Sequence, residues 1–314
     1  MRRLRSEDGV ALMLVLWLIV VLAAVAATVV STVRRQSDVV INLRARAQAR
    51  VAAESGVVFA LDELRTAFAA TKGLDELVRV YPAVADRLQR LGAQPLGNTK
   101  FQVALVDLNS RIDLNHVDDA TLAVFLTTFA GESDARALTD ALLDWRDPDS
   151  AQRSAGAEAD AYRAAGSPYL PPNRPIRRLE EVLRIRGFTD GVANEIAPYV
   201  TVWGDGRLNV NTASPRVLSA FPGIGSSGAS MLMDARGSEG IRSLTSMGER
   251  LSRGGIGGVM PPLVGVPQRL LIVSRGWAEG HALTHETQVV LQLQGLAPGR
   301  APDLFVMAWE ERSR

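Results

Sequence analysis

The chain has 314 residues, 47% of them hydrophobic, and a formal net charge of +1. The near-neutral charge argues against a general binder of polyanions, and the absence of cysteine excludes disulfides, thiolate metal sites and a cysteine nucleophile. The length suffices for two or three domains with hydrophobic cores.

A long apolar helix is the first element that the chain predicts. Gly9 to Val33 carries no charge, and every side chain from Val10 to Ala27 is apolar. A helix over Val10–Val30 measures about 31 Å, which matches the hydrocarbon core of a bilayer. We therefore expect a permanent transmembrane helix at residues 10–33. A cleaved secretory signal is the alternative, because three alanines near the end of the apolar run fit a signal cleavage site.

A short charged leader, MRRLRSEDG, precedes this helix and ends in Gly9. A charged leader that ends in glycine before an apolar helix resembles the prepilins. The resemblance implies that a prepilin peptidase cuts between Gly9 and Val10, and that Val10 becomes the N-methylated first residue. Pilins commonly carry glutamate at the fifth mature position, where this chain has Leu14. A glutamate in lipid needs a partner, so its loss suits a subunit with none above it, at a filament tip.

The helix is expected to continue beyond the membrane to about Thr71. No proline occurs before Pro82, and apolar residues recur close to helical spacing. A basic last turn and a C-cap glycine then end the helix. A second helix is expected at residues 76–91, and alternating residues predict a strand at 101–107.

An internal repeat follows the first strand. Asn109–Asn115, NSRIDLN, recurs as DGRLNVN at Asp205–Asn211, an offset of 96 residues. Each copy is typical of a turn, a short strand and a helix capped by Asp118 or by Ser214. We interpret the repeat as a structural unit used twice. We expect the last asparagine of each copy, Asn115 and Asn211, to cap the backbone rather than to bind a ligand.

Further helices are expected at residues 134–145 and 176–186. The segments 182–200 and 217–225 look like helix-hairpin-helix units, in which a glycine turn can bind a DNA phosphate. This gives an alternative function, a membrane-anchored DNA receptor. Residues 204–260 contain six arginines and four acidic residues. That excess is small for a duplex binder, so we expect no nucleic-acid partner.

An acidic loop lies between the two copies. Five carboxylates occur within 17 positions, at Asp144, Asp147, Asp149, Glu158 and Asp160. Calcium takes six to eight oxygen ligands in a flexible loop, which such a segment can supply. The residue ladder of an EF-hand is absent. On composition alone, a solvated acidic loop and a calcium site both remain open.

Three strands close the chain, at residues 270–278, 286–294 and 304–309, and a shorter one is expected at 199–203. An antiparallel sheet packed on the long helix is the simplest architecture. The glycine-rich stretch 254–258 follows no phosphate-loop spacing and indicates a connector. No carboxylate-histidine-nucleophile pattern surrounds any serine, so we expect no catalytic residues and no enzymatic activity.

Together these features resemble the minor pseudopilin K family of type II secretion systems. The resemblance rests on the leader and anchor, Leu14, the two repeat copies, the DWRD…GAEADAY loop and the segment NRPIRRLEEVLRIRGFT, all in the family's order. It implies an α+β fold: a pilin-like long N-terminal helix, its first half transmembrane, packs on an antiparallel sheet. A large inserted helical domain contains the helix-hairpin-helix-like units.

The resemblance also implies a location and partners. Family members nucleate the pseudopilus tip with the minor pseudopilins I and J, for export of folded proteins. They cross the bacterial inner membrane once, with the N-terminus cytoplasmic and the body periplasmic. They bind calcium in the inserted region, and the matching residues here are the five carboxylates of the acidic loop.

The chain is therefore expected to divide into six parts. These are the leader (1–9), the transmembrane helix (10–33), the pilin-like helix and first strand (34–108), the inserted helical domain (109–200), the second strand-helix repeat (201–265) and the C-terminal antiparallel strands (266–314).

Overall fold

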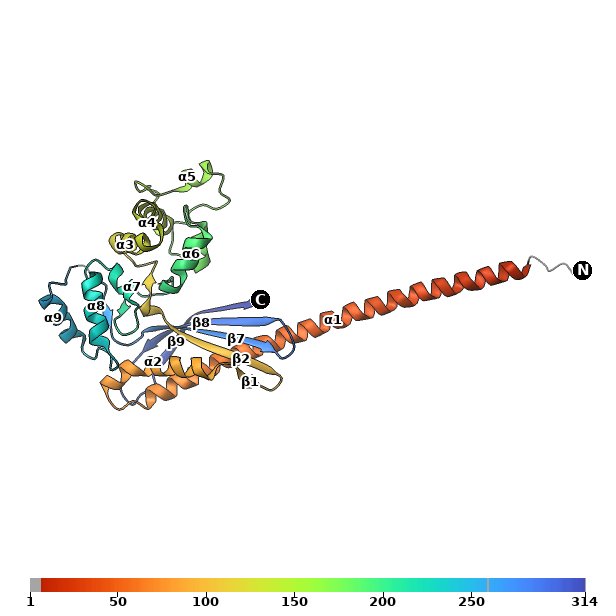
Figure 1. Ribbon diagram of the computed structural model, residues 1–314, viewed down its shortest axis with the longest axis horizontal. Helices are drawn as coiled ribbons and strands as arrows, with labels where there is room; N and C mark the ends of the chain where they lie inside the picture. Colours follow the sequence, from red (N-terminus) through yellow and green to blue (C-terminus); the bar gives the residue numbers. More distant parts are fainter. Residues whose placement is uncertain (1–6, 259, 314) are drawn as a thin grey trace, which may run out of the picture.

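A computed structural model describes residues 7–258 and 260–313. Its longest element is α1, Glu7–Ala69, a single helix that projects far from the body before it joins the sheet (Figure 1). Six of the nine predicted leader residues, 1–6, lie outside the described residues. Gly9 and Val10 lie in the first turns of the α1 backbone.

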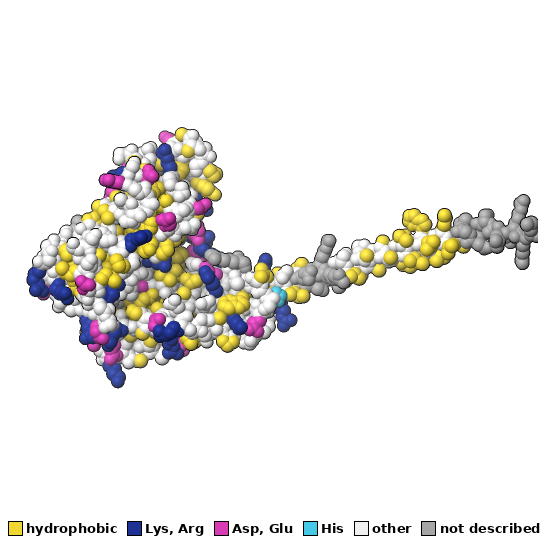
Figure 2. Space-filling view, viewed as in Figure 1, with side chains coloured by type: hydrophobic (Ala, Val, Ile, Leu, Met, Phe, Trp, Pro, Cys, Tyr) yellow, Lys and Arg dark blue, Asp and Glu magenta, His cyan; other side chains and the backbone are white. Residues whose placement is uncertain are grey.

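The projecting half of α1 contains a long apolar stretch that is exposed. Among the described helices, only the stretch Ala11–Thr32 is long and apolar enough to cross a membrane. Its 22 residues have a mean hydropathy of 2.9, and none of this window is buried in the protein. Hydrophobic side chains cover this part of the helix in Figure 2. The lower half of α1 belongs to the body instead.

The body is built on one antiparallel sheet with the strand order β1-β2-β7-β8-β9. The strand bounds are β1 Gln94–Leu96, β2 Thr99–Asp107, β7 Arg269–Ala278, β8 Thr284–Gln294 and β9 Asp303–Ser313. The strand predicted at 101–107 and the three C-terminal strands are confirmed. Each extends beyond its predicted bounds at one or both ends. The C-terminal strands pair beside β2, which begins some 170 residues earlier in the chain. The expected α+β fold, a long helix on an antiparallel sheet, is confirmed.

Small residues let α1 approach the sheet closely. Ala49, Ala52 and Ala53 are fully buried on the helix face that meets β7. A Cβ atom added to Gly276 of β7 would overlap the backbone of this helix face. Further along α1, Leu64 and Phe68 are completely buried, and burial of such a side chain contributes about 1.5–3 kcal/mol. The helix α2, Leu74–Leu91, packs beside α1 and adds five buried hydrophobic residues to the same core.

The two copies of the repeat form helical lobes on the body. The first copy contains η1 (Leu108–Ser110), β3 (Ile112–Asp113), α3 (Asp119–Ala130), α4 (Glu132–Arg146), α5 (Ala159–Ala164), η2 (Leu179–Arg184), α6 (Asp190–Ile196), η3 (Ala197–Tyr199) and β4 (Val200–Thr201). The second contains β5 (Leu208–Asn209), α7 (Pro215–Ala220), α8 (Gly225–Arg236), α9 (Leu244–Arg253) and β6 (Leu263–Val264). Each copy closes with a short parallel pair, β3 with β4 and β5 with β6.

The predicted helix at 176–186 is wrong in type and length. The structure has only the short 3₁₀-helix η2 there. The reason is the spacing of the apolar residues: Leu179, Val182 and Ile185 recur every three positions, which places them on one face of a 3₁₀-helix. The strand expected at 199–203 is likewise reduced to the two residues of β4, because only these pair with β3.

Candidate functional site

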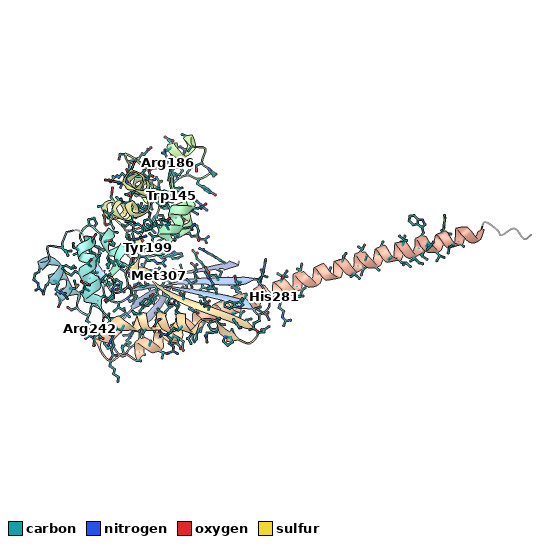
Figure 3. The ribbon with its side chains drawn as sticks, in the orientation of Figure 1. Trp145, Arg186, Tyr199, Arg242, His281 and Met307 are labelled. Carbon is teal, nitrogen blue, oxygen red and sulfur yellow. The ribbon has the colours of Figure 1, made fainter. Side chains whose placement is uncertain are left out.

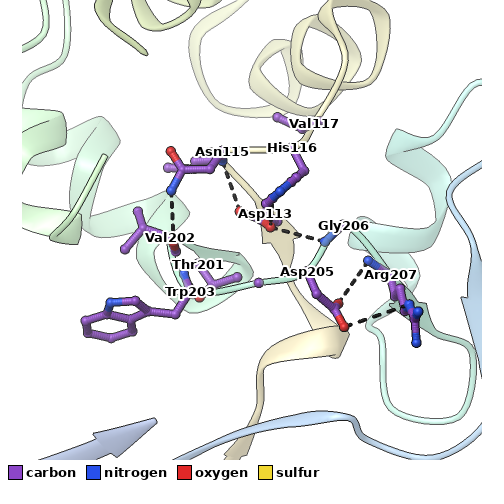
Figure 4. Close-up of polar contacts among 12 residues, drawn as sticks. Asp113, Asn115, His116, Val117, Thr201, Val202, Trp203, Asp205, Gly206 and Arg207 are labelled. Carbon is purple, nitrogen blue, oxygen red and sulfur yellow. Dashed lines mark hydrogen bonds and ion pairs between the residues drawn. The ribbon is translucent and has the colours of Figure 1, made fainter. Parts of the chain in front are cut away.

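An asparagine in each copy ties three segments together. Asn115 donates through Nδ2 to the carbonyl oxygens of Ile176 and Val202, both at 2.9 Å, and its Oδ1 accepts from the Ile176 N–H at 2.8 Å. Figure 4 shows the bond to Val202. The side chain bonds the backbone, but the expected capping role is wrong, because the amide joins distant segments of the chain. The helix caps are separate residues, Asp118 and Ser214, as predicted.

The second copy repeats this geometry. Asn211 donates to the carbonyl oxygens of Ile241 at 3.0 Å and Gly265 at 2.9 Å, and it accepts from the Ile241 N–H at 2.7 Å. Asn211 is 9% exposed, so each of its bonds replaces one that water would otherwise provide. The repeat is therefore a duplicated structural unit, and its asparagines are not free to hold a ligand.

An arginine that the sequence reasoning missed completes each unit. Arg146, at the end of α4, donates to the carbonyl oxygens of Leu114 and Val117. Arg236, at the end of α8, donates to those of Val210 and, at 2.8 Å, Ala213. Burial lowers the pKa of both guanidinium groups. The carbonyl groups that accept these bonds are 96 residues apart in the two copies, but the two arginines are not. Comparison of the two motifs therefore could not reveal the arginines.

The two copies meet at Asp113. Its Oδ1 accepts from the Asn115 N–H at 3.0 Å, and its Oδ2 accepts from the Gly206 N–H at 3.2 Å (Figure 4). His116 Nδ1 lies 2.5 Å from the same Oδ2. Gly206 has a φ of +72°, a conformation that favours glycine. The histidine is thus part of the junction between the copies.

Asp107 joins the sheet to the second copy. Its carboxylate accepts from the Asn109 N–H at 2.8 Å, from Asn209 Nδ2 at 2.8 Å and from Thr212 Oγ1. Burial raises the pKa of Asp107 to about 6, although the three hydrogen bonds oppose that shift. Tyr81, also buried near this carboxylate, has a raised pKa.

The acidic loop brings some of the predicted calcium ligands together. Asp144 is completely buried, and its carboxylate accepts from the Arg153 N–H at 3.2 and 3.3 Å. Glu158 is 6% exposed and belongs to the same group of interacting charges as Asp144 and Asp147. Gly156 allows the loop to approach, since a Cβ there would overlap the Asp144 carboxylate.

Several carboxylate oxygens in this loop are buried without a hydrogen bond. They are both oxygens of Glu158 and Oδ1 of Asp147, with Oδ1 of the neighbouring Asp140, which is ion-paired to Arg136. Burial raises the pKa of Asp144, Asp147 and Glu158, and repulsion among the carboxylates adds to the effect. Oxygen atoms that are buried and lack partners are the kind of group that a calcium ion would satisfy.

The other two predicted ligands lie differently. Asp149 is exposed, and its Oδ1 accepts from the Ala151 N–H at 2.8 Å. Asp160 is at the surface and forms an ion pair of 2.6 Å with Arg163. Within the described residues, no three acidic or histidine side chains are arranged closely enough to hold a metal ion. The donor set of Asp144, Asp147 and Glu158 therefore fits calcium in chemistry but not in the distances of this conformation.

Comparison with known proteins places these features in one family. Two family models, both of type II secretion system protein K, match residues 104–205 and 208–266. The boundary between the two matched ranges, at residues 206–207, falls at the start of the second copy of the repeat. Together they cover just over half of the chain.

Curated relatives carry the same description. Type II secretion system protein K of Pseudomonas aeruginosa is 34% identical over 124 residues, which is 39% of this chain and 37% of that protein. Type II secretion system protein K of Aeromonas hydrophila is 37% identical over 81 residues, 25% of this chain and 24% of that protein. The matched region thus spans well under two thirds of either relative.

A solved structure shares the fold. The crystal structure of the GspK-GspI-GspJ complex from the enterotoxigenic Escherichia coli type 2 secretion system contains a chain that aligns with a TM-score of 0.63. The alignment covers 89% of this chain and 99% of that one, at 17% sequence identity.

Proposed function

This chain belongs to the family of type II secretion system protein K, and we propose that it is a minor pseudopilin at the tip of the pseudopilus. The observation that carries the proposal is one continuous helix with two different halves. Ala11–Thr32 is apolar and free of protein contacts, while the rest of α1 packs on an antiparallel sheet. A helix of this kind can stay in the inner membrane or enter a filament while it holds a body outside the lipid.

We propose that processing follows the prepilin route. A prepilin peptidase removes the leader after Gly9, Val10 is methylated, and the body lies in the periplasm with the N-terminus on the cytoplasmic side. The charged leader that ends in Gly9 and the uncharged helix after it support the cleavage site. The orientation is proposed from the prepilin resemblance, because arginines both precede and follow the helix.

The tip position is supported by two features. Leu14 takes the place of the glutamate that would need a partner from a neighbouring subunit. The two helical lobes enlarge the body beyond the sheet, and α8 and α9 lie at the end of the molecule opposite the anchor (Figure 1). Such bulk hinders a further subunit from adding above, so the chain caps the filament rather than extending it.

The proposed partners are the minor pseudopilins I and J. A similar chain occurs in a complex described as GspK-GspI-GspJ. In this chain, Val40 and Leu43 of α1 are 63% and 59% exposed just beyond the apolar stretch, where a partner helix can cover them. The proposed role is assembly, with no catalytic step.

We also propose that the acidic loop binds calcium as a structural ion. The support is the set of buried carboxylate oxygens without hydrogen bonds at Asp147 and Glu158, next to the buried Asp144. A divalent cation would offset the repulsion that raises the pKa of these three groups. Its binding requires the loop to move its carboxylates closer together than they lie here.

Replacement of Gly9 tests the route into the membrane. The full chain is expressed with a prepilin peptidase, and the N-terminus of the membrane-bound product is sequenced. The expected product begins at Val10, and Gly9→Val leaves uncut precursor. A mature protein that begins near Arg34 and is free of lipid would contradict the proposal.

A second experiment tests the tip assembly. Because the chain has no cysteine, Val40→Cys provides a single thiol for disulfide cross-linking to cysteines placed in the helices of I and J. Cross-links are expected from position 40 and not from Val124→Cys, an exposed site on α3. Equal cross-linking at both sites would refute the predicted helix contact.

A further inference from the structure

One segment of the first copy is much more basic than the chain as a whole. Residues 167–186 contain five arginines and two glutamates, a net charge of +3, whereas the whole chain has a net charge of +1. The segment runs from the loop after α5 through η2. The lobe that contains it projects away from the sheet (Figure 1).

Both glutamates of this segment are already paired. Glu180 forms an ion pair of 2.6 Å with Arg312 of β9, and Glu181 forms one of 3.4 Å with Arg174. Within residues 167–186, all of which the structure describes, the guanidinium groups of three exposed arginines form no ion pair with a carboxylate. These are Arg177, Arg184 and Arg186. The positive charge of this surface is therefore available to a partner.

Apolar side chains lie among these charges. Tyr169, Leu170 and Leu183 are 46%, 44% and 46% exposed. The guanidinium carbon of Arg184 lies 4.6 Å from the centre of the Tyr169 ring. This cation–π contact joins the loop to η2 and orients both side chains at the surface. Figure 3 labels Arg186 on the same lobe.

The loop that presents Tyr169 is held in place. Asn173 adopts a φ of +47°, and its Nδ2 donates to the Asp149 carbonyl and, at 3.4 Å, to Ser150 Oγ. Pro171 and Pro172 restrict the backbone between these anchors. An exposed aromatic residue on a restrained loop loses little conformational entropy on binding, which is a property of interface hot spots.

We propose that Tyr169, Leu170, Leu183, Arg184 and Arg186 form a docking surface for an acidic protein segment that carries an apolar or aromatic side chain between its carboxylates. Charge complementarity selects this partner, since three arginines without an ion pair lie on the same segment as the exposed apolar side chains, and one of them contacts the Tyr169 ring. The arginines can pair with the carboxylates of such a segment, while Tyr169 contacts its apolar or aromatic side chain.

A polyanion fits this surface less well. Duplex DNA requires a stripe of cations spaced along its phosphates, and anionic lipid requires a broad basic face. Here an apolar centre interrupts the charges. The proposal does not depend on the position of the chain in a filament, so it can fail without any change to the proposed function.

The test measures the binding of a fluorescent peptide to the full chain in detergent. The probe is a short peptide in which glutamates flank a tryptophan and a leucine, and its counterpart carries glutamine in place of every glutamate. The glutamate peptide is expected to bind saturably. Arg184→Glu with Arg186→Glu should weaken it by at least about tenfold, and the glutamine peptide should bind as weakly as that variant does.

The matched control reverses two exposed arginines of α9, Arg250→Glu with Arg253→Glu, and should leave the affinity unchanged. Tyr169→Ala supplies a variant without a charge change and should also weaken binding. Melting temperatures verify that each variant is folded. The proposal is overturned by a lack of saturable binding, by equal losses at the two arginine pairs, or by stronger binding of duplex DNA or phosphatidylglycerol vesicles than of the peptide.

Discussion

The two copies of the repeat share a frame and differ in what that frame surrounds. Each has a parallel strand pair, an asparagine that joins three segments and an arginine that holds two carbonyl groups. In the first copy, eight buried side-chain atoms between Thr139 and Asn173 have no hydrogen-bond partner. The described residues of the second copy, residues 208–258 and 260–266, contain none.

This difference distinguishes the buried polar groups that the shared frame requires from those that occur only in the first copy. In the part of the second copy that the structure describes, the frame closes without a buried polar side-chain atom that lacks a hydrogen bond. Three of the unsatisfied atoms of the first copy lie on α4, at Thr139, Asp140 and Trp145, and the other five lie in the segment between α4 and η2. Unsatisfied buried carboxylates in native proteins call for an explanation, and a bound cation supplies one.

The largest expected effect comes from breaking the shared frame at matched positions. Asn115→Ala and Asn211→Ala each leave two carbonyl groups and one N–H without a partner, and Asn211 is the more buried of the two. Each substitution is expected to lower the free energy of unfolding by about 3 kcal/mol, measured by urea denaturation of the full chain in detergent. A loss below about 1 kcal/mol at either site would show that the copies do not depend on this contact.

The next largest effect is expected from calcium, because the proposed site lies in the first copy only. At a concentration one hundred times its Kd, calcium should add about 2.7 kcal/mol to the stability of the first copy. Hydrogen exchange should show added protection around Asp144 and none in α7 or α8. Asp147→Asn with Asp149→Asn should remove the effect of calcium, while Asp234→Asn on α8 should not. Equal protection of both copies would exclude a site in the loop.

The parts of the fold that the sequence predicted well are those fixed by local patterns. The span of α1, the C-terminal strands and the caps at Asp118 and Ser214 all follow from apolar periodicity and helix-end chemistry. The repeat could be found because its backbone bonds require the same residues at the same spacing.

The remaining features depend on contacts that a linear pattern does not record. The paired arginines, Arg146 and Arg236, are separated by 90 residues rather than 96, because α7 and α8 are both shorter than α3 and α4. Asp160 lies on α5 with its side chain at the surface, although it is only two residues from the buried Glu158. The direction of a carboxylate in a loop is set by the local turn, so counting acidic residues selects the segment but not the ligands.

A smaller effect should come from pH, through the carboxylate that connects the sheet to the second copy. The folded pKa of Asp107, about 6, is higher than that of an unfolded aspartate, about 3.9, so the folded protein binds the proton more tightly. Its stabilising contribution is complete below the unfolded pKa and is lost as the pH rises through 6. Between pH 5 and pH 7 the expected loss is about 1 kcal/mol.

Asp107→Asn removes this titration and should flatten the pH dependence of unfolding between pH 5 and pH 7. Asp234→Asn, at an exposed position on α8, should leave the slope unchanged. A rise in stability from pH 5 to pH 7 that disappears in Asp107→Asn would reverse the assigned sign.

The smallest effect is expected where each copy touches the rest of the body through exposed ion pairs. Glu180 of the first copy pairs with Arg312 of β9, and Glu239 of the second pairs with Arg79 of α2 at 3.1 Å. Both glutamates are more than half exposed, so water and salt screen the attraction. Glu180→Gln and Glu239→Gln should each cost less than about 1 kcal/mol, and the cost should decrease at high salt. A cost above that at Glu180 alone would mean that the first copy is held to the sheet by charge. The apolar contacts of Trp203 with the sheet would then contribute less than their burial implies.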